Sequence, residues 1–346
     1  MAITNLNDNI LSFLHEGTVI PAHPLVLKKS TKDIDEQEQR NLTRYYINSG
    51  AGGVAVGVHT TQFEIRNAEF NLLEPVLQIV SDEIDNAGLT NPFIKIAGIC
   101  GPTEQAVQEA QMALKHNYHF GLLSMGGLQH LSEQELIDRT RKVAEVIPVF
   151  GFYLQPAVGG RILSYDFWKA FAEIENVHAI KVAAFNRYQT IDVVKAVASS
   201  SRANKIALYT GNDDNIVADL LTPYRFDIDN KVIEKRFVGG LLGHWAFCTE
   251  HAVQTLGEVK TCIQNNYSGV EALLAKGIEI TDTNAAVFDV ANNFHGCISG
   301  IHEMLRRQGL MNHIECLLDK EQLSAGQLEL IDEICEKYFP HLKINR

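Results

Sequence analysis

Lys181 is the residue of this sequence with the clearest chemical potential. It stands inside the apolar run of residues 177–185, and an isolated ammonium group buried in apolar surroundings is costly. Burial favours the neutral amine and lowers the pKa of a lysine, and a neutral amine attacks a carbonyl carbon to give a Schiff base. The resulting iminium ion is an electron sink, so an adjacent C–C bond can break or form. A structural lysine that reaches a salt bridge would fit the same pattern.

Position along the run separates Lys181 from two other lysines in apolar stretches. Lys95 follows Pro92 by three residues, and Lys205 opens its run. In a parallel barrel, functional groups project from the carboxyl ends of the strands, whereas the opposite face serves stability. Lys181 lies further along its run, and we therefore predict that it is the nucleophile.

Other candidates follow two further apolar runs. Thr60 and Thr61 come directly after residues 52–58, where their hydroxyl and backbone N–H groups could bind a carboxylate or only complete a turn. Tyr153 ends the run of residues 148–153 and could be either a proton shuttle or a rim residue. The histidines form neither HxH nor HExxH, so we expect no metal site.

Eight runs rich in Val, Ile, Ala and Gly predict the strands that position these residues. They cover residues 18–27, 52–58, 93–99, 120–125, 148–153, 177–183, 205–210 and 237–242. Several are continuously apolar, as in parallel strands covered on both faces. Amphipathic stretches separate them, among them residues 104–115 and a segment that begins with the capping-box pair Ser132 and Glu135. The alternation predicts an α/β fold, a (β/α)8 TIM barrel. The competing doubly wound sheet lacks support, because no GxGxxG follows the first strand.

The last third of the chain differs from the rest. Beyond residue 262 the strand pattern stops, and residues 268–276, 282–309 and 324–338 have helical spacing, with Gly309 as a helix end. We therefore predict a catalytic barrel over residues 1–262 and an additional C-terminal helical layer, residues 263–346, packed on it.

Composition narrows the class of protein. The 346 residues are 46% hydrophobic and 21% charged, with a net charge of −12. This balance disfavours nucleic acid and anionic membranes as partners, because both are bound by clustered Lys and Arg. The sequence has no long apolar run for a membrane span and no signal-peptide pattern at its start. Six cysteines without CxxC pairs read as reduced thiols, so we expect a cytoplasmic protein.

Several motifs, in order, resemble those of the dihydrodipicolinate synthase / N-acetylneuraminate lyase family of class I aldolases. His59-Thr60-Thr61-Gln62 is similar to the family's Gly-Thr-Thr-Gly-Glu loop. The segment from Tyr153 to Gly160 is similar to Tyr-Asn-x-Pro-x-x-Thr-Gly, and Ile180-Lys181-Val182-Ala183 to the family's Ile-Lys-Glu-Ala strand. The turn Thr210-Gly211-Asn212-Asp213-Asp214 and the pair Gly239-Gly240 complete the set. The interval between Tyr153 and Lys181 also matches the family.

This resemblance implies roles and partners. Lys181 would form the Schiff base with a 2-keto acid, typically pyruvate, and Tyr153 would relay protons. Thr60 and Thr61 would hold the carboxylate of the keto acid, and Gly211 would be a further substrate-binding residue. The resemblance implies a lyase that needs neither cofactor nor metal and that forms a homo-oligomer, a dimer or tetramer.

The departures from the family pattern leave the exact reaction open. The second tyrosine of dihydrodipicolinate synthase, in a Pro-Tyr-Tyr segment, is absent from residues 124–128, and Val158 stands at the family's arginine. These changes argue against a role in lysine biosynthesis. The alternatives are a sugar-acid dehydratase acting through the same lysine and a non-catalytic protein that binds a keto acid. For the enzyme we expect a small-molecule 2-keto acid or aldehyde as substrate. A metal-dependent barrel hydrolase is the least favoured.

Overall fold

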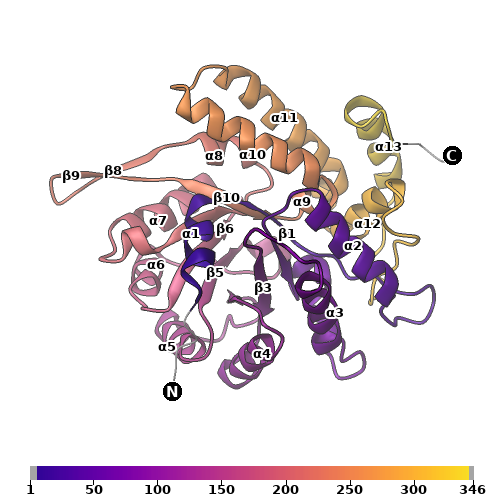
Figure 1. Ribbon diagram of the computed structural model, residues 1–346, viewed down its shortest axis with the longest axis horizontal. Coiled ribbons are helices and arrows are strands. Elements are labelled where there is room, and N and C mark those ends of the chain that lie inside the picture. Colours follow the sequence, from indigo (N-terminus) through magenta and orange to yellow (C-terminus); the bar gives the residue numbers. More distant parts are fainter. Residues whose placement is uncertain (1–5, 343–346) are drawn as a thin grey trace.

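The computed structural model describes residues 6–342 and consists of a parallel β-barrel surrounded by helices (Figure 1). Eight strands form one sheet in the order β1-β10-β7-β6-β5-β4-β3-β2. Their bounds are β1 Val19–Pro21, β2 Gly53–Val56, β3 Ile94–Ile99, β4 Phe120–Ser124, β5 Val149–Leu154, β6 Val177–Ala183, β7 Ala207–Thr210 and β10 Phe237–Leu242. A parallel bridge between Ala22 and Ala55 joins the two ends of this order and closes the barrel. The predicted (β/α)8 fold is confirmed.

The predicted strands agree with the observed ones with one marked difference in length. The runs at 177–183 and 237–242 match β6 and β10 from end to end. The first run, 18–27, gives only the short strand β1. Pro21 and Pro24 lack the backbone N–H that a longer strand would need, and this limits the ladder.

Helix α1 Asp8–Glu16 precedes β1 and packs Ile10 and Leu14 against the hydrophobic cluster inside the barrel. The helices that follow the strands in turn cover the outside of the barrel. They are α2 Glu36–Asn48, α3 Leu73–Asp85, α4 Thr103–Lys115, α5 Glu133–Ala144, α6 Tyr165–Ala172, α7 Arg187–Ala198, α8 Ile216–Leu221, α9 His244–Phe247 and α10 Thr249–Gln264. Helix α5 begins with the predicted capping box, in which the Glu135 N–H donates to Ser132 and the Ser132 N–H donates to the Glu135 carboxylate.

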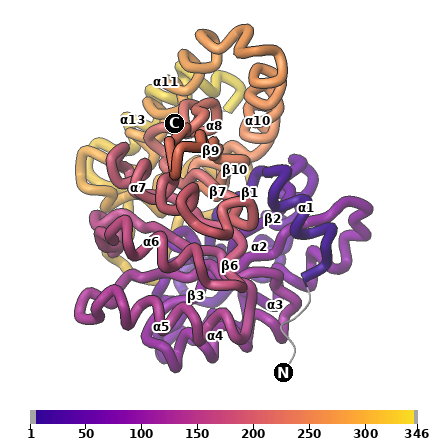
Figure 2. The backbone as a smooth tube through the Cα atoms, turned by 90° about the vertical axis from the view of Figure 1, so that its left-hand side faces the viewer, coloured from indigo at the N-terminus to yellow at the C-terminus, as the bar shows by residue number. Residues whose placement is uncertain are grey.

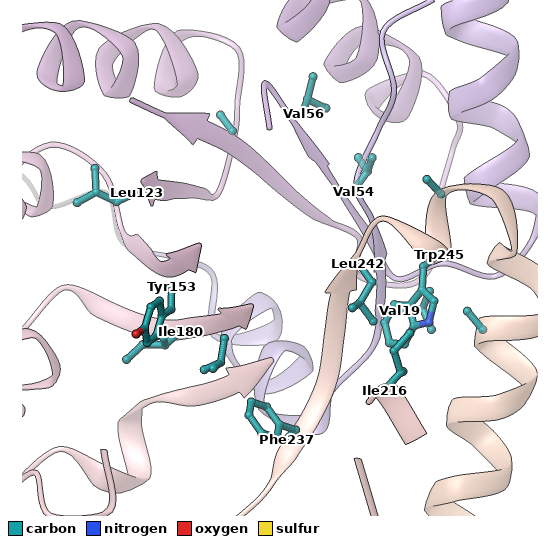
Figure 3. Close-up of a cluster of buried hydrophobic side chains, with 14 of the residues drawn as sticks. Val19, Val54, Val56, Leu123, Tyr153, Ile180, Ile216, Phe237, Leu242 and Trp245 are labelled. Atoms are coloured by element: carbon teal, nitrogen blue, oxygen red, sulfur yellow. The ribbon is translucent and has the colours of Figure 1, made fainter. Parts of the chain in front are cut away.

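Side chains of each strand alternate between the inside of the barrel and the helical shell, as the pleat requires. In β5, Phe150 and Phe152 belong to the inner hydrophobic cluster, whereas Val149 and Tyr153 belong to the outer one. In β6, Ala179 is inner and Ile180 is outer. Figure 3 shows Tyr153 and Ile180 together among the side chains of the outer cluster. This alternation decides which predicted site residues can meet.

An antiparallel hairpin between α8 and β10 was not predicted. It consists of β8 Tyr224–Ile228 and β9 Lys231–Lys235 and projects from the barrel (Figure 1). Asp229 and Asn230 form its turn with φ angles of 52° and 60°. Two successive residues with positive φ are typical of the tight turns that favour Asn and Asp, so the signal was present in the sequence.

The C-terminal layer contains three further helices, α11 Val270–Val287, α12 Cys297–Arg307 and α13 Gln327–Tyr338. The prediction of one helix over 282–309 was wrong, because a non-helical segment separates α11 from α12. Asp289, Asn293 and Phe294 have φ angles of 55°, 54° and 65°, which no right-handed helix contains. Gly309, with a φ of 72°, ends α12 as expected.

This layer packs against the loops at one end of the barrel, and Figure 2 shows it gathered on one side of the molecule, with α10 and α8. The Asn284 amide donates to the Asp213 carbonyl oxygen at 2.7 Å. The Leu317 N–H donates to the side-chain oxygen of Gln62 at 2.6 Å. Within residues 6–342, none of the helices is both long and apolar enough to cross a bilayer.

Candidate active site

A pocket opens between the carboxyl ends of the strands and the C-terminal layer. About 570 Å³ of empty space lies between its walls, part of it open to solvent. The residues that line it are Ala22, Val58, His59, Thr60, Phe152, Leu154, Gln155, Val158, Lys181, Ala183, Phe185, Gly211, Asp213, Gly243, Phe288, Phe294, Cys297 and Ile301. Barrel and C-terminal layer therefore both contribute to the wall.

Lys181 lies on the inner face of β6, where its pairing partner on β5 is Phe152. The side chain is buried, and Nζ lies 4.4 Å from the centre of the Phe152 ring. Burial lowers the pKa of Lys181, while the charge of Asp213 acts in the opposite direction. The structure thus places a desolvated amine in the pocket, as a Schiff-base nucleophile requires.

Asp213 is a second ionisable group of this pocket. It follows β7 by three residues, and its carboxylate accepts a hydrogen bond from the backbone N–H of His244 at 2.9 Å. Burial raises the pKa of Asp213, and the charge of Lys181 partly offsets this effect. Burial therefore moves the pKa of the amine down and that of the carboxyl up, which makes proton exchange between such groups less costly.

Gly211 gives Lys181 the space it occupies. A Cβ atom at this position would lie 2.6 Å from Cε of Lys181 and 2.9 Å from Cβ of Ala183. Such contacts are shorter than packed side chains tolerate, so any larger residue must displace the lysine. Gly211 lines the pocket, but its clearest contribution is to the path of the Lys181 side chain.

Replacing Gly211 by alanine should lower the rate of Schiff-base formation by about 100-fold, since a shift of about 1 Å at a reacting group can cost that much. The measurement is the rate of borohydride trapping with pyruvate. Gly257→Ala is a matched control, because nothing lies within 4 Å of a Cβ at that position of α10. Equal trapping rates in the two variants would contradict this role for Gly211.

The structure separates the two threonines that follow β2, within the short helical turn His59–Thr61. Thr60 lines the pocket, and its hydroxyl donates to the Ala22 carbonyl oxygen at 2.8 Å. The Thr61 hydroxyl donates to the His23 carbonyl oxygen at 2.6 Å and accepts from the N–H groups of Gly57 and Val58. Thr61 is not part of the pocket wall. It completes the turn, which was the structural alternative of the sequence analysis.

Tyr153 does not meet Lys181, contrary to its predicted role as proton relay. Its ring belongs to the outer hydrophobic cluster (Figure 3). It stacks on Trp168 at a centroid distance of 5.3 Å. Because side chains alternate along β5, the neighbouring Phe152 takes the inward position opposite Lys181. The interval between Tyr153 and Lys181 identified strand β5 correctly, but a shift of one residue along a strand moves a side chain to the opposite face of the sheet.

We therefore expect Tyr153→Phe to change turnover less than about threefold, because the hydroxyl lies outside the pocket. Loss of a general acid–base group would instead cost about 100- to 10,000-fold. The measurement is kcat with the best 2-keto acid substrate. A loss in the larger range would show that Tyr153 reaches the reacting atoms after all.

Sequence reasoning missed several pocket residues. Asp213 was considered only as part of a turn, although that turn follows a predicted strand. His59 is half-buried in the wall, and desolvation lowers its pKa. Phe288, Phe294 and Ile301 come from the C-terminal layer, and no local pattern links that layer to the barrel mouth.

Comparison with known proteins gives the fold and the family. The closely similar folds include dihydrodipicolinate synthase from Oceanobacillus iheyensis, with a TM-score of 0.73 at 15% identity, covering 96% of this chain and 99% of that chain. N-acetylneuraminate lyase from Fusobacterium nucleatum has a TM-score of 0.70 at 17% sequence identity, and the match covers 94% of this chain and 99% of that chain. YagE, a prophage protein from E. coli K12 whose structure is a complex with pyruvate, has a TM-score of 0.73 at 15% identity, and the match covers 93% of this chain and 98% of that chain.

Comparisons of sequence, in contrast to those of structure, gave a match to one family model. A search of curated proteins found no match. The model of the dihydrodipicolinate synthetase family, in contrast, matches residues 20–222, which is more than half of the chain and includes β6 with Lys181. The protein therefore belongs to the dihydrodipicolinate synthetase family.

Proposed function

We propose that the protein is a Schiff-base-forming class I lyase that makes or breaks a C–C bond of a pyruvate-type 2-keto acid. The observation that carries the proposal is the Lys181 amine, which is buried, has a lowered pKa and lines the pocket at the barrel mouth. Family membership supports the proposal, and so does the crystal structure of the similar protein YagE, which was determined in complex with pyruvate.

The reaction begins when the neutral Lys181 amine attacks the keto carbon. Loss of water gives the iminium ion, and removal of a proton from the adjacent carbon gives an enamine. The enamine carbon then attacks an aldehyde, and water releases the product and restores the amine. In the opposite direction the same steps cleave the bond.

Proton transfers need a group with a pKa near the working pH. Because Tyr153 faces away from the pocket, we assign this task to Asp213, whose carboxyl lies in the pocket with a raised pKa. For the carboxylate of the keto acid we propose the backbone N–H of Thr60, whose hydroxyl already donates to Ala22, together with Gln155, which follows β5 in the pocket wall. Thr61 would support them by holding the turn.

Borohydride reduction with pyruvate, followed by peptide mass spectrometry, tests this function. We expect a reduced adduct on Lys181, and a panel of 2-keto acid aldols and sugar acids would then separate C–C cleavage from loss of water. If neither pyruvate nor 2-oxobutanoate gives an adduct on Lys181, the proposal fails.

A keto-acid-binding protein without turnover is a second candidate. Phe152 favours it, because it leaves the strand position opposite Lys181 without a hydroxyl group. Such a protein would form the adduct but would release no aldol product with any aldehyde.

We also propose a cytoplasmic location, which the six free cysteines support, since free thiols are typical of reducing compartments. Assembly into a homo-oligomer stays a prediction from the family resemblance. Size-exclusion chromatography with light scattering would test it.

A further inference from the structure

Two phenylalanine rings from distant parts of the chain meet at the pocket. Phe185 follows β6, and Phe294 lies between α11 and α12. Both line the pocket and are half-buried. Their rings meet edge to face, with centroids 5.8 Å apart and an interplanar angle of 72°. This is a favourable geometry for an aromatic pair, and the wall it forms is continuous from barrel to C-terminal layer.

Both rings are held by backbone conformations that bulky residues rarely adopt. The φ angles are 50° at Phe185 and 65° at Phe294. Each such residue is strained and persists only where surrounding contacts impose its conformation. The Asn212 side chain accepts from the Phe185 N–H at 2.9 Å, and the Asp289 carbonyl oxygen accepts from the Phe294 N–H at 3.0 Å. Strain of this kind is typical of functional sites.

The loop of Phe294 is itself fixed. The Asp289 carboxylate accepts from the Gly296 N–H at 2.9 Å and from the Asn292 amide at 2.7 Å. Because this loop is tied at both ends, Phe294 is a preformed part of the wall, where the C-terminal layer meets the barrel.

The rest of this wall is also apolar. Phe288 and Ile301 extend it within the C-terminal layer, and Leu154 and Val158 extend it from the barrel. Among the described residues that line the pocket, Lys181 is the only Lys or Arg. Arg161 lies outside the pocket wall and donates to the carbonyl oxygens of Leu128 and Leu131. A phosphate or a row of hydroxyl groups would thus lack partners along this wall.

We propose that the second reactant is an aldehyde with an aromatic or other apolar substituent, which packs against Phe185 and Phe294. The inference rests on the proposed Schiff-base function and adds the substrate class. Pyruvate occupies the polar side near Thr60 and Gln155, and the substituent of the aldehyde occupies the apolar side.

The chemistry balances without a further reactant. The enamine carbon forms a bond to the aldehyde carbon, and the aldehyde oxygen takes a proton and becomes a hydroxyl group. Hydrolysis of the iminium ion consumes the water that its formation released. The product is a 4-hydroxy-2-keto acid that carries the apolar substituent on C4.

The test compares benzaldehyde with erythrose as the aldehyde, each with pyruvate and the full-length protein. We expect kcat/KM for benzaldehyde to exceed that for erythrose at least about tenfold, because hydroxyl groups against an apolar wall are left unpaired. Phe294→Ala should lower the benzaldehyde value about tenfold, while borohydride trapping of pyruvate alone stays within about threefold of wild type. Phe226→Ala removes another half-buried phenylalanine, which lies in β8 and outside the pocket. This control should leave the ratio of kcat/KM for benzaldehyde to kcat/KM for erythrose unchanged.

Three results would overturn the inference while the proposed function stands. They are a preference for erythrose, equal losses for both aldehydes in Phe294→Ala, and an absence of product with either aldehyde despite trapping at Lys181. Failure to trap pyruvate at Lys181 in the wild-type protein is a different result, because it overturns the proposed function and this inference with it.

Discussion

Lys181→Met should abolish borohydride trapping of pyruvate and lower turnover by at least about 1,000-fold, because no covalent intermediate can form without the amine. Methionine has a similar length and no charge. Since burial disfavours the Lys181 ammonium group, the free energy of unfolding should be unchanged or higher in the variant. Mass spectrometry and urea unfolding give the two readouts.

Lys95→Met is the matched control. Lys95 is also buried, but its Nζ donates to Asp85 at 2.6 Å and to Ser81 at 3.0 Å outside the barrel. We expect this variant to trap pyruvate normally and to lose about 1 to 3 kcal/mol of stability, because polar groups lose their partner. An adduct that persists in Lys181→Met would show that a different lysine is the nucleophile.

Asp213→Asn should lower kcat by about 100- to 10,000-fold, as expected for loss of a general acid–base group. It should also change the pH dependence of trapping. The ionised carboxylate of Asp213 raises the pKa of Lys181, so its removal lowers the pKa of the amine. The neutral amine then appears at lower pH, and the trapping profile shifts in that direction.

The amide of asparagine has an oxygen that can still accept from the His244 N–H, so the local fold should be retained. Asp214→Asn makes the same chemical change one residue further on, at an exposed side chain that does not line the pocket. We expect kcat within about threefold of wild type in that variant. If Asp213→Asn lowers kcat without shifting the pH profile, Asp213 has a structural role and the assignment of proton transfer fails.

The sequence alone predicted the architecture and the presence of Lys181 in the candidate site. Continuous apolar runs at regular intervals are a local property of strands buried on both faces, and they are visible without any knowledge of tertiary contacts. Lys181 could be recognised for the same reason, since a charged residue inside such a run must be desolvated or paired. Its place towards the carboxyl end of the run indicated the functional face.

Neighbouring residues at strand ends were harder to predict. Tyr153 and Phe152 are adjacent, and only one of them can face the inside of the barrel. The choice depends on the register of β5 against β6, which is set by the whole sheet. The hydroxyl of Thr61 was similarly ambiguous until its three backbone partners were known.

The composition of the pocket was decided by tertiary structure alone. Phe294 comes from the C-terminal layer and meets Phe185 across more than a hundred residues of chain. Asp213 is likewise tied to Asn284 of α11 through a backbone carbonyl. Local sequence patterns report how a segment folds, because they arise from contacts within a few residues. The contacts that give this pocket its apolar wall form between segments that pack only after each has its own structure.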